Sequence, residues 1–222
     1  MARPTGRPRA SGESLTGLGT RRDILAAGAR LFCAEGYGST STHALAKAAG
    51  IRQASVYHYF SGKHEVLLEL LLGTVQPSLD AAARLLARPE PPEQRLWALC
   101  VADVRVLAGG EENVGSLYLL PELGDERFAT FHERRSDLET AYRTLVAACG
   151  ATDVAHATAL VLGLVESVIL QRRRAPESID DATAVGIADA ALRVLEVDAG
   201  AVRRAREAGA VLLEEIAADE AP

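Results

Sequence analysis

The chain has 222 residues, of which 48% are apolar and 24% are charged, a composition that excludes a wholly disordered chain. Forty alanines and thirty leucines, against four phenylalanines and one tryptophan, favour helices and argue against an all-β sandwich or barrel. The net charge of −6 is unevenly divided, because residues 1–65 carry +5 and the remainder carries −11. A basic segment joined to an acidic body indicates that only one part of the protein binds a polyanion.

The expected location is the cytoplasm. The longest apolar stretch, residues 154–170, contains His156 and Glu166, so we expect no membrane-spanning segment. No apolar segment follows the N-terminal arginines, which argues against a signal peptide. Three widely spaced cysteines lie within helical patterns: Cys33, Cys100 and Cys149. Their odd number and spacing predict small buried residues in a reducing compartment, without a disulfide or zinc framework.

Residues 1–19 mix proline, glycine, serine, threonine and arginine without periodicity, which predicts a flexible basic arm. Its Gly6-Arg7-Pro8 segment is similar to the core of an AT-hook-like arm, which lies in a narrow A·T minor groove. A solubilising tail that attracts phosphate without sequence preference is the alternative.

Four helices are predicted next, over residues 20–35, 41–48, 53–59 and 63–74. Thr20, Thr40 and Ser61 precede or open three of them as N-caps, and Gly50 supplies the tight turn between the two short helices. Two short helices around a glycine turn are typical of a helix-turn-helix.

Further helices are predicted over residues 76–87, 93–108, 127–149, 153–174, 180–197 and 200–218, with breaks at proline or glycine. Their apolar residues recur at helical spacing, which indicates a bundle. The predicted fold class is therefore all-α, with an N-terminal three-helix helix-turn-helix domain and a C-terminal helical bundle.

The residues around the two short helices resemble the DNA-binding domain of TetR-family transcriptional regulators. The resemblance is carried by Gly36-Tyr37, Thr40 to Ala46, Ala49-Gly50-Ile51, Val56 to Phe60, Lys63 and Val66-Leu67. These residues match, in order and at family spacing, a glycine-aromatic pair, a threonine-capped helix, an Ala-Gly-hydrophobic turn, a Tyr-x-x-Phe run and a lysine that opens the next helix. Tyr59 departs from the pattern, because the family often has histidine there.

The resemblance implies that residues 53–59 form the recognition helix. The predicted DNA-binding residues are Thr40, Thr42, His43, Arg52, Gln53, Ala54, Ser55, Tyr57, His58, Tyr59 and Lys63. Gln53 can pair with adenine and Ser55 can donate or accept, although both can also serve only the turn. Tyr57 and Lys63 are expected at phosphates. Ala54 either touches a thymine methyl group or permits close approach, and His43 either reads the groove or is solvated.

The resemblance also divides the chain into an arm (1–19), a helix-turn-helix domain (20–66), a ligand-binding and dimerisation domain (67–198) and a C-terminal helical extension (199–222). The helices near 153–174 and 180–197 are expected to form a homodimer interface. A mostly apolar effector is expected between helices, near Trp97, Tyr118, Leu120, Phe128, Phe131 and Glu166. The alternatives are that the aromatic residues fill the core and that Glu166 is an edge or paired carboxylate.

The predicted function is a DNA-binding transcriptional repressor that binds a pseudo-palindromic operator as a dimer and is released by a small molecule. A ligand-independent or activating regulator of the same fold is the alternative. The sequence has no G-x-S-x-G, no phosphate-cradling glycine loop and no metal-ligand spacing, so we expect no enzyme, catalytic residue, metal or cofactor. An enzyme and a structural helical adaptor are the rival classes.

Overall fold

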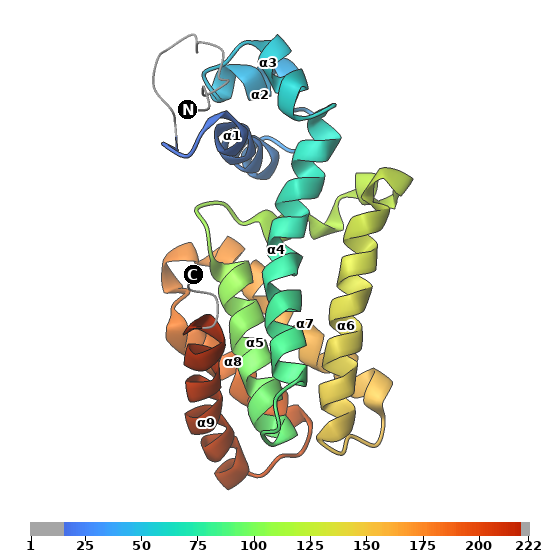
Figure 1. Ribbon diagram of the computed structural model, residues 1–222, viewed down its shortest axis with the longest axis vertical. Coiled ribbons are helices and arrows are strands. Elements are labelled where there is room, and N and C mark those ends of the chain that lie inside the picture. Colours follow the sequence, from blue (N-terminus) through green and yellow to red (C-terminus); the bar gives the residue numbers. More distant parts are fainter. Residues whose placement is uncertain (1–15, 219–222) are drawn as a thin grey trace, which may run out of the picture. The chain divides into compact units, whose positions relative to one another are not determined.

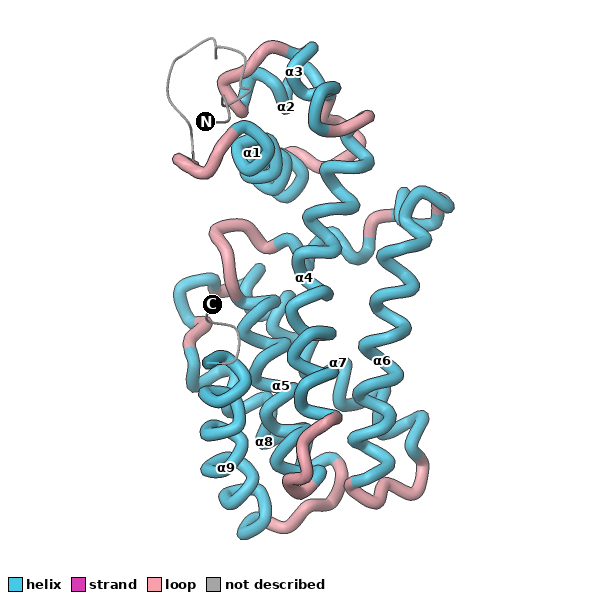
Figure 2. Tube along the Cα trace, in the orientation of Figure 1, coloured by secondary structure: helices cyan, strands magenta, loops and turns pink. Residues whose placement is uncertain are grey.

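The computed structural model describes residues 16–218 (Figure 1). Within this range the chain forms helices and short 3-10 turns joined by loops, with no strand (Figure 2), which confirms the all-α prediction. Residues 6–8, the predicted minor-groove segment, lie outside the described residues. The chain separates into two compact units between Leu71 and Leu72.

Unit 1 contains α1 (Thr20–Ala34), α2 (Thr42–Ala48), α3 (Gln53–Tyr59) and the start of α4 (Lys63–Leu86). One apolar side of each helix faces a common core, whose members include Ile24, Phe32, Leu45, Val56, Phe60 and Val66. Because α3 buries only Val56 completely, most of this helix is available for other contacts.

Two predicted N-caps are wrong. Gly19 precedes α1, and no side chain caps the helix. Asp23 accepts instead from the backbone amide and hydroxyl of Thr16, at 2.9 and 2.8 Å. Ser41, not Thr40, caps α2, because its side chain accepts from the amide of Ala44 at 3.1 Å.

The predicted break between residues 74 and 76 is also wrong, since α4 runs unbroken through Pro77. A proline inside a helix removes one backbone hydrogen bond. Pro77 is exposed, whereas Leu71, Val75, Ser78 and Ala82 form a buried stripe along the other side. Burial of that stripe outweighs the lost bond, so the helix continues.

Unit 2 contains the rest of α4 and five further helices, α5 (Pro92–Ala108), α6 (Ala129–Ala148), α7 (Val154–Arg174), α8 (Asp181–Val194) and α9 (Ala199–Ala218). The central helix is α5, which packs against α6, α7, α8 and α9 (Figure 1). Between α5 and α6 the chain forms three 3-10 turns that the sequence did not predict, η1 (Val114–Leu119), η2 (Pro121–Gly124) and η3 (Glu126–Phe128). A fourth, η4 (Pro176–Ser178), precedes α8.

Candidate nucleic-acid interface and ligand cavity

The turn between α2 and α3 fixes the relative placement of these two helices. Gly50 adopts a φ of +66°, which glycine tolerates without strain. The next residue, Ile51, is buried, and its amide donates to the carbonyl of Ala46 at 3.0 Å. A backbone bond and a buried side chain therefore hold α3 against α2.

Polar side chains of α2 and α3 meet on the exposed side of the helix-turn-helix. The hydroxyls of Thr42 and Tyr57 lie 3.2 Å apart, and Gln53 Nε2 donates to Thr42 Oγ1 at 3.2 Å. Tyr57 is 53% exposed although its hydroxyl is held. The side chains are thus oriented before any ligand arrives, which reduces the entropy lost on binding.

The other predicted DNA-binding residues differ in how far they are exposed to solvent. The exposed ones are His43, Arg52, Ala54 and His58, and the partly buried ones are Ser55 and Tyr59. Thr40 is 1% exposed, and its hydroxyl donates to the carbonyl of Gly36 at 2.9 Å. Thr40 therefore supports the loop before α2.

Lys63 is bound to the same loop. Its ammonium donates to the carbonyls of Tyr37, Gly38 and Thr40, at 2.7, 3.2 and 2.9 Å, and lies 4.3 Å from the centre of the Tyr37 ring. Three carbonyls use all three of its donors. The side chain holds the start of α4 to the loop that precedes α2.

The positive charge of the described part of unit 1 is modest. Residues 16–71 contain six basic and four acidic side chains. Arg21 is paired with Glu69 and stacks over Phe60, at 4.7 Å. The larger excess noted in the sequence depends on the three arginines of residues 1–15.

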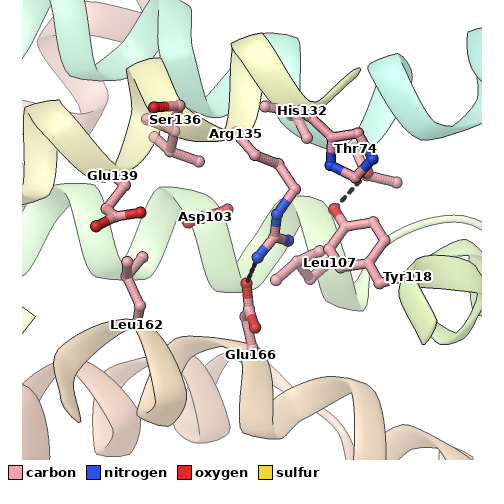
Figure 3. Close-up of a pocket in the computed structure, with 12 residues that line it drawn as sticks. Thr74, Asp103, Leu107, Tyr118, His132, Arg135, Ser136, Glu139, Leu162 and Glu166 are labelled. Carbon is pink, nitrogen blue, oxygen red and sulfur yellow. Dashed lines mark hydrogen bonds and ion pairs between the residues drawn. The ribbon is translucent and has the colours of Figure 1, made fainter. Parts of the chain in front are cut away.

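A cavity of about 190 Å³ lies within unit 2 (Figure 3). Its walls come from α4, α5, η1, α6 and α7. The lining residues that carry polar groups include Thr74, Asp103, Tyr118, His132, Arg135, Ser136, Glu139 and Glu166. The wall is therefore more polar and more charged than the sequence led us to expect.

Arg135 extends from α6 toward Glu166 on α7 (Figure 3). Its Nη2 donates to Glu166 Oε1 at 2.6 Å, and its guanidinium carbon lies 4.7 Å from the centre of the Tyr118 ring. The Tyr118 hydroxyl lies 2.6 Å from Thr74 Oγ1. The sequence singled out Glu166 but not Arg135, because nothing distinguished Arg135 within a run of charged residues.

Asp103 is the buried acid of this cavity, with 4% of its surface exposed. Burial raises the pKa of its carboxyl to about 6, although hydrogen bonds from Ser78 at 2.7 Å and Tyr142 at 3.0 Å act in the opposite direction. Asp103 was not among the residues predicted from the sequence. The feature that could have revealed it is the position of an acidic residue inside the apolar run from Leu96 to Val104.

The predicted effector residues do not all meet at this cavity. Tyr118 and Glu166 line it, and the Phe131 ring lies behind Tyr118, with 5.3 Å between the ring centres. Trp97, Leu120 and Phe128 do not line it. Trp97 is 2% exposed, and its Nε1 donates to Asp189 on α8 at 3.0 Å.

Two helices of the described chain, α4 and α7, are long and apolar enough to cross a membrane by length and composition alone. Within their most apolar 18-residue segments, 39% of the α4 residues and 22% of the α7 residues are buried.

An apolar surface follows α7 and α8. Gly163 on α7 and Gly186 on α8 are exposed, and a Cβ added to either would meet no atom within 4 Å. Leu160, Leu170 and Val194 are 43%, 52% and 39% exposed. Among residues 16–218, no packing contact accounts for these small and apolar exposed residues.

The comparisons with known proteins agree with this architecture. A family model described as bacterial regulatory proteins, tetR family, matches residues 24–70. The crystal structure of AmtR from Mycobacterium smegmatis is 41% identical, with a TM-score of 0.80, and the match covers 94% of this chain and 98% of AmtR. The TetR-family regulator PfmR from Thermus thermophilus is 26% identical, with a TM-score of 0.68, covering 77% of this chain and 97% of PfmR.

AibR, solved in complex with isovaleryl coenzyme A and operator DNA, has the same fold at 20% identity, with a TM-score of 0.64 and coverage of 77% and 96%. No curated protein matches the chain. The extent of the match to AmtR, the family model over residues 24–70 and the helix-turn-helix geometry lead to one conclusion: the chain belongs to the TetR family of bacterial transcriptional regulators.

Proposed function

We propose that the protein is a dimeric repressor that binds a pseudo-palindromic operator through α3 and leaves it when a small molecule occupies the cavity of unit 2. The observation that carries the DNA-binding part is the exposed, pre-oriented set of Thr42, Gln53 and Tyr57. A hydroxyl suits a phosphate, and a glutamine amide suits the edge of adenine. The Thr42 bond leaves one amide hydrogen and the amide oxygen of Gln53 for that edge.

The apolar surface of α7 and α8 supports the dimer. Glycine inside a helix is unfavourable by about 0.5–1 kcal/mol relative to alanine, so Gly163 and Gly186 need a packing reason. A second copy of the chain supplies one, because two equivalent faces with small residues can approach closely about a two-fold axis.

The cavity supports ligand control through α4. Thr74 and Val75 of α4 line the cavity, and Lys63 in the first turn of the same helix is bound to the loop of residues 37–40. A ligand that prefers one position of α4 would therefore shift the equilibrium between two forms of the dimer. AibR is an example of this fold with both an operator and a small molecule bound.

The test starts with selection of bound sequences from a random duplex pool, followed by footprinting and a gel shift. We expect a protected palindrome whose half-sites lie one helical turn, or a multiple of it, apart. The control is a variant with Gln53→Ala and Tyr57→Ala, which should leave the fold intact and bind without sequence preference. Selection of no common sequence would contradict the proposal, and transcription that rises with bound protein would favour the activating alternative.

A further inference from the structure

The cavity of unit 2 carries an excess of negative charge. Three carboxyl groups line it, those of Asp103, Glu139 and Glu166. Arg135 pairs with Glu166, and Arg143, which is not a lining residue, pairs with Glu139 at 2.9 Å, so the excess is the carboxyl of Asp103. Two other titratable residues belong to the wall: His132 has its Nε2 2.8 Å from the carbonyl of Leu123, and the Tyr118 hydroxyl lies 2.6 Å from Thr74 Oγ1. Charges in a partly enclosed site are screened less than on an open surface, so this excess favours a positively charged ligand.

Arg135 marks the place where a cation is held. Its guanidinium lies over the Tyr118 ring and donates to Glu166, so an aromatic face and a carboxylate act on one positive group (Figure 3). An aromatic face with a carboxylate is a favourable environment for an organic cation. The Arg135 side chain is 35% exposed, so it can leave this position for solvent without crossing the core.

We propose that the cavity binds a small organic cation, with an amidinium, guanidinium or primary ammonium group, which replaces Arg135 between Tyr118 and Glu166. The inference rests on the proposed effector function of this cavity and names the ligand class. The cavity volume of about 190 Å³ exceeds a cavity of about 150 Å³ that holds benzene, so a compact ring or short chain fits.

An organic anion is disfavoured by the same residues. A carboxylate on Arg135 would have to displace Glu166 and would approach the carboxyl groups of Asp103 and Glu139. A cation that displaces Arg135 is attracted instead by Glu166, which it frees, and by Asp103, whereas Glu139 stays paired with Arg143. The released guanidinium turns toward solvent, because Glu139, one turn further along α6, already accepts from Arg143 at 2.9 Å.

Replacement of Arg135 by a bound cation would break an ion pair between two helices. The Arg135–Glu166 bond links α6 to α7, and α7 carries part of the proposed dimer surface. A cation bound to Glu166 alone leaves α6 without this link. The ligand therefore binds more tightly to the form in which α6 and α7 are less closely joined, which is the differential affinity that a conformational effect requires.

The test uses three probes of the same shape, benzamidinium, benzamide and benzoate, on the full chain. Binding is measured by calorimetry and by the shift in melting temperature. We expect benzamidinium to bind, benzamide to bind more weakly and benzoate not to bind. Glu166→Gln should weaken benzamidinium at least about tenfold, while Glu133→Gln, which removes the same charge from an exposed position of α6 outside the cavity, should not.

Arg135→Ala gives a second test, because it should change the affinity for a cationic ligand and for an anionic ligand in opposite directions. If the site takes a cation, this variant should bind benzamidinium several-fold more tightly, because nothing has to be displaced. Weaker benzamidinium binding in Arg135→Ala, preferential binding of benzoate, or no binding of benzamidinium or butylammonium would overturn the proposal. Operator binding is measured separately: a cation that binds in a Glu166-dependent way without releasing DNA supports the ligand class and contradicts the proposed release.

Discussion

The ammonium of Lys63 donates to the carbonyl of Tyr37 at 2.7 Å and so joins the first turn of α4 to the loop before α2. Two further carbonyls, of Gly38 and Thr40, complete its hydrogen bonds. This lysine was expected at a phosphate from its place at the start of a helix. Its geometry adds a structural role, and the two roles have different consequences when the side chain is removed.

The first prediction separates Lys63 from Tyr57. Lys63→Ala should lower the free energy of unfolding by about 1.5–3 kcal/mol, because charge-assisted hydrogen bonds are lost. Tyr57→Phe should leave stability unchanged and weaken operator binding by about 1 kcal/mol, equally on all operator variants. Since the Tyr57 hydroxyl carries no charge, the salt dependence of binding should not change. Thermal melts and fluorescence anisotropy at several salt concentrations measure both effects, and unaltered DNA affinity in Tyr57→Phe would remove this phosphate contact.

The second prediction concerns base recognition by Gln53. Gln53→Ala should lower discrimination at one base pair of each half-site by about 1–3 kcal/mol, with little effect at the others. Thr42→Val removes the hydroxyl that orients the Gln53 amide, whereas Thr42→Ser keeps it. We expect the valine variant to lose part of the same discrimination and the serine variant to keep it. A panel of single-base operator variants is the measurement, and an even loss across all positions would make Gln53 a phosphate contact.

The third prediction concerns residues 2–15. Their deletion removes three arginines but keeps Thr16, which donates to Asp23. If each arginine neutralises one phosphate, the slope of log affinity against log salt should fall by about 3 per subunit. A larger loss on operators with A·T flanks than with G·C flanks would indicate minor-groove recognition by the Gly-Arg-Pro segment. Equal losses on both flanks would leave only a charge effect.

The helices were predictable because their apolar residues recur at helical spacing and their ends carry local signals. The bounds predicted for residues 53–59 agree with α3, and those for residues 153–174 lie within one residue of α7. The errors arose where tertiary contacts, and not local sequence, determine where a helix begins or ends. Pro77 is a local signal to stop, but the buried face of α4 extends past it.

The lining of the proposed effector cavity was harder to predict from the sequence than the exposed polar residues of α2 and α3. Thr42, Gln53 and Tyr57 are close in sequence, so helical spacing alone brings them together on one side of α2 and α3. The cavity instead combines Tyr118, Arg135 and Glu166 from three separate elements. Large aromatic residues suggested an apolar site, but Trp97 is used between α5 and α8, where Asp189 accepts from its ring N–H. Which charged residues face inward depends on packing that the sequence pattern does not contain.

The fourth prediction is a pH dependence of stability due to Asp103. Burial raises the pKa of this carboxyl to about 6 in the folded chain, against about 4 in the unfolded chain. Hydrogen bonds from Ser78 and Tyr142 act in the opposite direction and lower this pKa. Of the charged residues of the cavity, Glu166 raises the pKa of Asp103 and Arg135 lowers it. The folded state therefore holds the proton more tightly, and its stability should fall as pH rises from about 4 to about 6 and then level off. A shift of about two pKa units corresponds to about 3 kcal/mol.

Asp103→Asn removes this titration. We expect its unfolding free energy, relative to the unsubstituted chain, to improve by about 3 kcal/mol between pH 4 and pH 7, as measured by urea unfolding. Asp181→Asn is the matched control, because a hydrogen bond from Arg105 lowers the pKa of that exposed carboxyl and gives a dependence of the opposite sign. A difference between Asp103→Asn and the unsubstituted chain that stays constant from pH 4 to pH 7 would show that the pKa is not raised.

The last prediction concerns the dimer surface on α7 and α8. Gly163→Glu and Gly186→Glu place a charged side chain where each subunit by itself has open space, so the subunit should fold normally. In a dimer that packs these faces together, the two carboxylates would be buried without partners, which would weaken dimerisation by several kcal/mol.

Gly124→Glu is the matched control, because a Cβ at Gly124 also meets no atom within 4 Å and this glycine belongs to η2, outside α7 and α8. Sedimentation should then find a dimer for the unsubstituted chain and Gly124→Glu, and a monomer for the two helix variants. Because a monomer contacts one half-site at a time, the monomeric variants should also lose affinity for the full operator while retaining their helical content. Dimers that persist at micromolar concentration in both Gly163→Glu and Gly186→Glu would place the subunit interface elsewhere.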